Sequence, residues 1–389
     1  MAKIRVLILL TTFIVVGVVG TFAILYARGF RLKISDESII LGPTGLLVAN
    51  SDPVAAQVFI NGELKTATDN TISLAPGDYH VEVKKEGFIS WQKDIHIEQE
   101  TVTQIDAFLI PTAPSLTALT FSGAINPVVN EDNTKIIYVV PPTKDNPEKS
   151  GLWLIESGNL PLGFNRDPRQ VTDGDLTNSQ YEFSPDSRQV ILTDSDGTYL
   201  LDLSIFTSQS QRQDVTSTIE SIKKNWQEDD AKKLKARLSH LPDELESAFL
   251  EHASDIRFSP DDNRILYTAS GSATLKENLV PKLPGSSTQK EERTIQDSHI
   301  YVYDIREDKN FKVSDSIPVY WLPNSLNLVR PLEDRIEIID YDGTNAKSVF
   351  TGAYNYPHAF ATTSVNRILI LTSFAADNSL ANLYWVSLK

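Results

Sequence analysis

The first pattern along the chain is an uninterrupted apolar run. From Val6 to Ala27 the sequence has no charged residue and is rich in Leu, Ile and Val. About 20 apolar residues at roughly 1.5 Å rise per residue span the hydrocarbon core of a bilayer. We therefore predict a transmembrane helix that anchors the chain over residues 4–27. A cleaved signal peptide is the alternative, but its apolar core is shorter and ends at small residues, a pattern that Leu25-Tyr26-Ala27 fits poorly.

Basic residues flank this run on both sides, with Lys3 and Arg5 before it and Arg28, Arg31 and Lys33 after it. The count of positive charges that sets membrane orientation is therefore nearly balanced. Because short N-termini usually stay inside, we predict a single-pass membrane protein whose C-terminal part is extracytoplasmic.

Residues 44–111 follow a different period. Tyr79, Val81 and Val83 alternate with polar residues, as in a half-buried strand, and the other strand-like stretches of this segment show no helical period. Asn61-Gly62 lies between two such stretches and predicts a hairpin, because both turn positions favour positive φ. The pattern predicts a compact, antiparallel β-sandwich. His80 and His96 fall on the polar faces of their strands, where we expect them to be solvated.

This segment resembles the PEGA domain family over residues 44–110. The residues that carry the resemblance are Pro76, Gly77, Tyr79, Val81, Val83, Gly87 and Phe88. The resemblance implies a small accessory sandwich of the kind common on bacterial and archaeal envelope proteins. It implies structural roles for these residues and no catalytic residue.

Residues 115–389 contain a repeated pattern of strand, turn and strand. Residues 181–192 align closely with residues 256–267, and weaker copies begin near residues 129, 321 and 364. The apolar residues that follow the turns recur at intervals of 40 to 75 residues, and the shortest interval is near the length of one four-stranded propeller blade. We predict a β-propeller of about five blades, in which residues 116–121 supply the last strand and close the ring.

Two of the repeat turns resemble the TolB-like and WD-like propeller repeats. They are Phe183-Ser184-Pro185-Asp186 and Phe258-Ser259-Pro260-Asp261. Proline presets φ at the first turn position and the Asp side chain bonds to nearby backbone, so we assign these residues structural roles. The whole chain is therefore expected to be mainly β.

The longest interval between repeats contains a helical insert, which we place at residues 214–252. Apolar residues recur there in steps of three and four, as on one face of an amphipathic helix. A cap on the propeller rim and a dedicated partner-binding helix are the two interpretations. Residues 272–297 are predicted to be a surface loop.

The composition of the chain restricts its possible partners and metal sites more than its fold. The 389 residues include 51 acidic and 36 basic residues, a net charge of −15, and no cysteine. Residues 1–33 contain five basic residues and no acidic residue, so the remainder of the chain carries a net charge of −20. This surplus argues against a nucleic-acid partner, and the missing cysteine excludes disulfides and thiolate metal sites.

No motif for catalysis appears in the sequence, neither G-x-S-x-G, H-E-x-x-H, a P-loop nor a Rossmann fingerprint. The turns at residues 194–197 and 340–343 are rich in Asp, but they lack the ligand spacing of an EF-hand and are predicted to be hairpin turns. His240, His252, His299 and His358 show no metal-ligand spacing. We therefore predict no catalytic residue, no metal site and no cofactor.

Two functions remain open. The first is a non-catalytic, membrane-anchored cell-envelope protein whose sandwich and propeller bind or scaffold protein or glycan partners. The second is a propeller-type glycan hydrolase that uses carboxylates of the central channel, about 5 to 10 Å apart.

Overall fold

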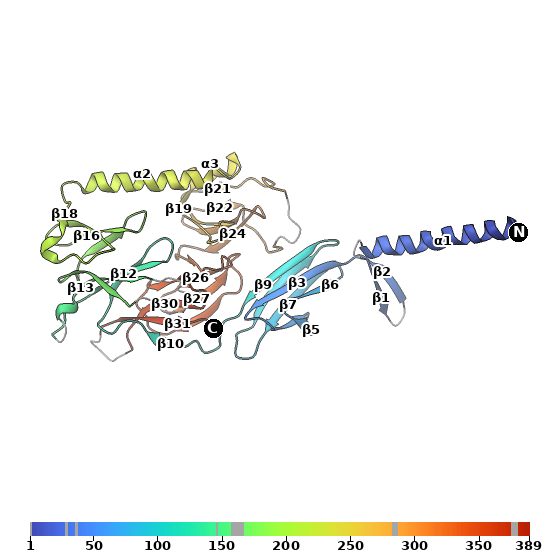
Figure 1. The fold of residues 1–389 in the computed structure, drawn as a ribbon, viewed down its shortest axis with the longest axis horizontal. Helices are drawn as coiled ribbons and strands as arrows, with labels where there is room; N and C mark the ends of the chain where they lie inside the picture. The colour runs from blue at the N-terminus through green and yellow to red at the C-terminus, as the bar shows by residue number, and fades with distance from the viewer. Residues whose placement is uncertain are drawn as a thin grey trace. The chain divides into compact units, whose positions relative to one another are not determined.

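The structure is a computed structural model that describes residues 2–27, 30–35, 38–144, 147–156, 167–281, 287–374 and 380–389, with the backbone alone for residues 2–7 and 31–41. The chain divides into two compact units. One unit holds Met1–Leu109 and Pro281–Lys290, and the other holds Ile110–Val280 and Glu291–Lys389 (Figure 1). Each unit is described by itself.

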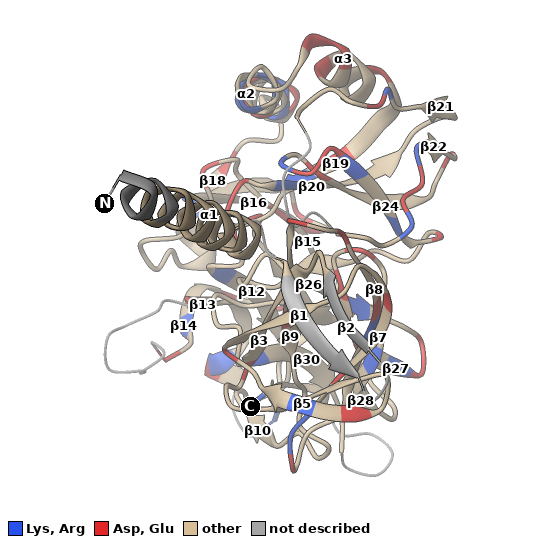
Figure 2. Cartoon of the chain, turned by 90° about the vertical axis from the view of Figure 1, so that its right-hand side faces the viewer, with Lys and Arg blue, Asp and Glu red and all other residues tan. Residues whose placement is uncertain are grey.

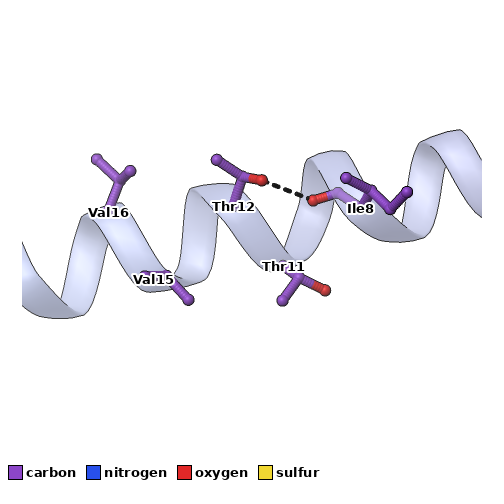
Figure 3. A pocket seen from close by; sticks show the side chains of 5 residues that line it. All are labelled: Ile8, Thr11, Thr12, Val15 and Val16. Carbon is purple, nitrogen blue, oxygen red and sulfur yellow. Dashed lines mark hydrogen bonds between the residues drawn. The ribbon is translucent and has the colours of Figure 1, made fainter.

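The apolar run forms a single helix, α1 (Ala2–Ala27), in which Ile8–Ala27 is long and apolar enough to cross a membrane and has no buried side chain. Residues Ile8–Ala27 carry no charged side chain (Figure 2). Thr12 donates its hydroxyl to the carbonyl of Ile8 at 2.9 Å (Figure 3), and Thr21 donates likewise to Gly17 at 2.8 Å. These hydroxyls therefore need no water, as a lipid environment demands. Arg28 lies outside the described residues.

The hollow drawn in Figure 3 is lined by Ile8, Thr11, Thr12, Val15 and Val16. One helix alone bounds it, so it is the surface of an apolar helix and not a ligand site. Two strands follow the helix, β1 (Arg31–Ser35) and β2 (Ser38–Gly42), and they pair antiparallel.

The sandwich follows as two sheets of short strands. The strands are β3 (Gly45–Asp52), β4 (Gln57–Ile60), β5 (Glu63–Ala67), β6 (Asn70–Leu74), β7 (Gly77–Lys84), β8 (Trp91–Ile97) and β9 (Val102–Phe108). One sheet has the order β6-β3-β9 and the other β5-β4-β7-β8. The predicted hairpin joins β4 to β5, with φ of 51° at Asn61 and 81° at Gly62.

The prediction of a purely antiparallel sandwich is wrong at one pair. β3 and β9 run parallel, from Leu46 opposite Val102 to Asp52 opposite Phe108. Period-2 alternation fixes which face of a strand is buried, but it carries no information about which strand lies beside it or in which direction. The first and last strands of the sandwich pair here after the chain has passed through the other sheet.

Alternate residues of the two sheets form one apolar core. Val81 and Val83 of β7 and Ile97 of β8 are buried completely, together with Leu47 of β3. A distant segment also belongs to this unit. The Thr288 hydroxyl accepts the N–H of His96 at 3.1 Å, and the Gln289 side chain donates to the carbonyl of Asp94 at 2.6 Å. These backbone groups lie on β8, a strand at the sheet edge.

The second unit is a propeller of five four-stranded sheets. Blade 1 contains β11 (Ile125–Val129), β12 (Lys135–Val140), β13 (Gly151–Glu156) and β14 (Arg169–Asp173). Blade 2 contains β15 (Gln180–Phe183), β16 (Gln189–Thr193), β17 (Thr198–Asp202) and β18 (Gln213–Asp214). Blade 3 contains β19 (Ala253–Phe258), β20 (Arg264–Ala269), β23 (Ile300–Asp304) and β24 (Lys309–Ser314). Single-turn helices η1 (Pro147–Lys149) and η2 (Gln209–Gln211) lie in connections.

Blade 4 contains β25 (Tyr320–Trp321), β26 (Asn327–Pro331), β27 (Arg335–Asp340) and β28 (Lys347–Thr351). Blade 5 contains β29 (Ala359–Phe360), β30 (Arg367–Thr372) and β31 (Asn382–Ser387), with β10 (Leu116–Ala118) as its outer strand. The pairing of Leu116 with Val386 and of Ala118 with Tyr384 closes the ring, as the sequence predicted. Closure joins the first blade to the last, so that neither lies at the end of an open array.

Neighbouring blades bury their faces against one another. Ile137 and Val139 of blade 1 pack against Val190 and Leu192 of blade 2, while Ile136, on the other face of β12, packs against blade 5. Blades 3 and 4 bury Val302 and Leu328 in the same way. At blades 4 and 5 the rings of Tyr320 and Phe360 lie 6.4 Å apart.

The helical insert covers the remaining face of blade 3. Helix α2 (Ile219–Leu238) passes along the blades from the region of β18 to that of β19, and α3 (Asp243–His252) follows it (Figure 1). Leu238, Leu245 and Phe249 pack against Tyr267 and Tyr303 of blade 3. Figure 2 shows Lys and Arg along α2 and the acidic start of α3. The helices thus bury an apolar face of blade 3 that faces away from blade 4.

The described part of residues 272–297 is mostly loop, as predicted, but it contains one short pair of strands that the sequence did not predict, and residues 282–286 lie outside the description. β21 (Ala273–Thr274) and β22 (Thr294–Ile295) pair antiparallel, and Leu275 and Ile295 are buried. Arg293 pairs with Asp308 at 2.8 Å. The polar composition of the segment predicted a loop. A two-residue strand beside one buried apolar residue is too short to produce a recognisable hydrophobic period in the sequence.

We predict that Phe249→Ala will destabilise the propeller by about 3–5 kcal/mol, because it leaves a cavity in a core. Phe249 is 1% exposed and its ring lies 5.0 Å from that of Tyr267. Urea unfolding of the full chain in detergent, followed by tryptophan fluorescence, measures this effect. The control Leu250→Ala changes a neighbour that is 50% exposed and should cost less than about 0.5 kcal/mol. Equal effects of the two variants would contradict the packing.

Candidate functional site

A cavity of about 990 Å³ opens in the propeller where the repeat turns meet. All five blades contribute to its wall, and α2 adds Arg237. The wall includes Val128 and Val129 of β11, Pro185 and Ser187 of the blade 2 turn, Phe258 of β19, Tyr320 and Trp321 of β25, and Phe360 of β29. The cavity therefore depends on the assembled ring, since residues from five separate parts of the chain meet there.

Blades 3, 4 and 5 make the aromatic side of this wall. Trp321 is 5% exposed and donates its indole N–H to the carbonyl of Arg257 at 3.4 Å. The ring of Phe360 lies 5.9 Å from that of His358. These contacts fix the aromatic side chains against the backbone and against one another.

Two arginines lie on the same side. The guanidinium carbon of Arg237 lies 3.9 Å from the centre of the Phe258 ring, and Arg237 also pairs with Asp262. The guanidinium carbon of Arg257 lies 5.6 Å from the centre of the Tyr320 ring. Both arrangements are cation–π contacts, in which the face of the aromatic ring attracts the positive charge.

Carboxylates line the side made by blades 1 and 2. Asp132 accepts the N–H of Thr134 at 3.0 Å, and Asp186 accepts the hydroxyl of Ser184 at 2.7 Å. Glu131 is exposed at the wall. The cavity is therefore not free of carboxylates, but Asp132 and Asp186 are used within their own turns.

Burial changes two titrating groups of the wall. Burial raises the pKa of Tyr320, so its hydroxyl stays protonated at neutral pH, and the positive charge of Arg257 opposes that shift. Burial lowers the pKa of His358, which keeps its imidazole neutral at pH 7. The only cations of the described wall at that pH are the two arginines.

The repeat-turn residues form matching hydrogen-bond sets. In the blade 2 turn, Asp186 also accepts the N–H of Arg188 at 3.1 Å, and the Ser184 hydroxyl accepts the N–H of Gln189 at 2.9 Å. In the blade 3 turn, Asp261 accepts the Ser259 hydroxyl at 2.6 Å, and Ser259 accepts the N–H of Arg264 at 2.9 Å. Phe183 and Phe258 end the strands before these turns, and Pro185 and Pro260 line the cavity.

The motif residues of the sandwich lie at turns and in the core. Val81 and Val83 are fully buried, and Phe88 packs against them from the edge of the core. The Tyr79 hydroxyl donates to the carbonyl of Ala75 at 2.9 Å, on the other side of Pro76. Gly77 and Gly87 adopt φ of 147° and 83°.

The remaining candidates for chemistry do not come together. His80 pairs with Asp94 at 2.6 Å and His96 pairs with Asp78 at 2.7 Å, as exposed pairs across β7 and β8. Residues 194–197 join β16 to β17, and residues 340–343 connect β27 towards β28. Within the described ranges, no group of three or more His, Cys, Asp or Glu side chains could hold a metal ion.

Sequence reasoning missed the residues that make this site. Arg257, Tyr320 and His358 belong to three blades and share no motif. The position of Arg257, one residue before the Phe258 of the repeat turn, is the only signal that could have located it. Arg237 was counted only as part of an amphipathic helix.

Comparison with protein families identifies the sandwich. Residues 44–112 match the family model of the PEGA domain. The sandwich is a PEGA domain. The match covers less than half of the chain, and a comparison with curated protein sequences finds no match.

Several solved structures are similar to the chain at low identity. TolB from Acinetobacter baumannii is 13% identical, with 79% of this chain and 59% of that chain covered and a TM-score of 0.20. The Cps50 (Swd1) β-propeller domain from Myceliophteria thermophila is 8% identical, with 71% and 86% covered and a TM-score of 0.26. The acylaminoacyl peptidase from Pyrococcus horikoshii is 12% identical, with 69% and 39% covered and a TM-score of 0.22. The chain thus spans less than two thirds of TolB and of the peptidase.

We predict that Asp261→Ala will destabilise the propeller by about 1 kcal/mol at pH 7, the contribution of a typical hydrogen bond. Burial alone would raise the pKa of Asp261, but the hydrogen bonds from Ser259 and Asn263 outweigh it and the pKa is lowered. A lowered pKa stabilises the fold above the pKa of the unfolded chain, and this stabilisation is lost as pH falls through the folded value.

The stability difference between the wild type and Asp261→Ala should therefore shrink between pH 6 and pH 3, as urea unfolding at each pH measures. Asp261→Asn is the matched control, because its amide oxygen still accepts hydrogen bonds and carries no titrating group. A pH-independent difference for Asp261→Ala would disprove the role of the ionised carboxylate.

Proposed function

We propose that this protein is a non-catalytic, membrane-anchored cell-envelope protein that binds a partner in the cavity of its propeller. One observation carries the proposal: all five blades and α2 contribute to a single cavity. A concave site lined by aromatic rings and a few charged groups is the usual form of a binding site. The PEGA domain and the apolar helix support a location at the envelope.

The proposed organisation has an anchor at residues 4–27, a PEGA sandwich at 44–111 and a propeller at 115–389 that holds the helical insert 214–252. The motif residues of the sandwich and of the repeat turns are proposed to act structurally. Their hydrogen bonds and burial support that role.

Glycan hydrolysis is the weaker candidate. It needs a pair of carboxylates that can act as acid and as base or nucleophile. Of the carboxylates on the wall, Asp132 and Asp186 accept hydrogen bonds inside their turns and Asp262 pairs with Arg237. Only Glu131 remains on the described wall for such a role, so the geometry favours binding over hydrolysis.

The orientation in the membrane can be tested because the sequence contains no cysteine. Ser210 is exposed, so we predict that Ser210→Cys in intact cells will react with a membrane-impermeant maleimide. Ala2→Cys, at the other end of α1, is the control and should react only after lysis. The reverse result would place the propeller in the cytoplasm.

The cavity can be tested by filling it. Glu131→Trp adds a ring at the cavity wall, and we predict at least tenfold lower recovery of the partner that full-length wild-type protein retains from envelope extracts. Glu333→Trp changes an exposed residue away from the cavity and should leave recovery unchanged. Equal recovery by all three proteins would refute the cavity as the binding site, and a glycan released by the wild type but not by Glu131→Gln would favour the hydrolase.

A further inference from the structure

The charged side chains that line the cavity are not equivalent. Arg237 is neutralised by Asp262. Arg257 differs: within the described residues, no carboxylate and no hydrogen-bond acceptor engages its guanidinium, and its ring contact with Tyr320 is its sole partner. Arg257 is therefore the cation of the wall that is available to a ligand.

Arg257 contacts an aromatic ring of the cavity wall. Its guanidinium carbon lies over the Tyr320 ring, and that ring lies 6.4 Å from the ring of Phe360 in the next blade. The planar guanidinium presents its N–H groups as a fork that matches a carboxylate. The ring contact limits the orientations of the guanidinium, and this reduces the entropy lost on binding.

The aromatic rings of the wall are either in contact with an arginine or largely buried. Arg237 covers Phe258 at 3.9 Å and Arg257 lies over Tyr320, while Trp321 and Phe360 are 5% and 9% exposed. A sugar ring binds by lying on an open aromatic face, and one face of Phe258 and one face of Tyr320 already carry a guanidinium. The apolar lining residues Val128, Val129 and Pro260 suit apolar side chains of a peptide.

The opposite side of the cavity limits the charge of the ligand. Glu131, Asp132 and Asp186 lie on the wall made by blades 1 and 2. A polyanion would meet like charges there, which disfavours binding. A ligand with a single carboxylate at one end avoids this repulsion.

We propose that Arg257 selects the ligand of the cavity by pairing with a carboxylate, and that this ligand is a peptide segment with a free C-terminal carboxylate and apolar side chains. The inference rests on the proposed function, which makes the cavity the binding site. It adds the class of ligand and the residue that recognises it.

The test uses the full chain in lipid nanodiscs and two pools of N-acetylated pentapeptides with apolar side chains. One pool ends in a carboxylate and the other in an amide, and mass spectrometry measures the peptides retained. We expect at least tenfold more retention from the carboxylate pool, and loss of that preference in Arg257→Gln, since a charge-assisted pair contributes about tenfold or more. Arg306→Gln, an exposed arginine of the β23–β24 turn, should keep the preference.

The variant Glu131→Gln tests whether the cavity wall selects anionic or cationic ligands. It should raise retention of the carboxylate pool, because it removes a like charge from the cavity wall. If a pool of amidated peptides with lysine is retained instead and Glu131→Gln abolishes that retention, the wall selects cations and the proposal fails. Retention of trigalacturonate in place of peptides would likewise overturn it, as would retention of neither peptide pool.

The two proposals fail in different ways. If both pools are retained equally, are lost in Glu131→Trp and are unaffected by Arg257→Gln, the cavity binds peptides but Arg257 does not select them. If Glu131→Trp changes neither peptide retention nor partner recovery, the cavity is not the binding site. Thermal unfolding of each variant checks that its propeller is folded, and Arg257→Lys, which keeps the charge but not the fork, should recover only part of the preference.

Discussion

Every blade of the propeller is a small sheet with two apolar faces, and both faces must be covered by a neighbour. The strand β12 shows the requirement directly, because Ile136 faces blade 5 and Ile137 faces blade 2. A linear array of such sheets would leave two faces bare at its ends. The ring removes these ends when β10 joins β31. With no cysteine in the sequence, burial and strand pairing hold the ring without a covalent link.

The turns add polar contacts between neighbouring blades. Lys135 of blade 1 donates to the carbonyl of Ser187 in the blade 2 turn at 2.5 Å, and Arg264 of blade 3 donates to that of Ser325 in the blade 4 turn at 3.2 Å. In blade 2, Gln189 occupies the position that Lys135 has in blade 1 and Arg264 has in blade 3. There α2 supplies the cations instead: Lys233 donates to the carbonyl of Pro185 at 3.2 Å, and Arg237 pairs with Asp262. The insert thus replaces a direct contact between the turns of blades 2 and 3.

This replacement connects the packing of the insert to the cavity. α2 ends at Leu238, which is buried against blade 3, and one residue earlier Arg237 lines the cavity wall. The same turn of helix therefore serves a core and a candidate binding site. From the sequence, a cap on the rim and a partner-binding helix were alternatives. One helix, α2, can fill both roles.

Local chemistry determined much of this protein from its sequence. The apolar run sets a helix, Asn61-Gly62 sets a hairpin through positive φ, and the Ser-Pro-Asp turns set the repeats because each side chain bonds within its own turn. Tertiary structure alone decided the parallel pairing of β3 with β9, the assignment of residues 287–290 to the sandwich unit, and the meeting of Arg257 with Tyr320 across two blades. The physical reason is range: turns and periodicity depend on neighbours in the chain, whereas a cavity depends on the ring that brings distant residues together.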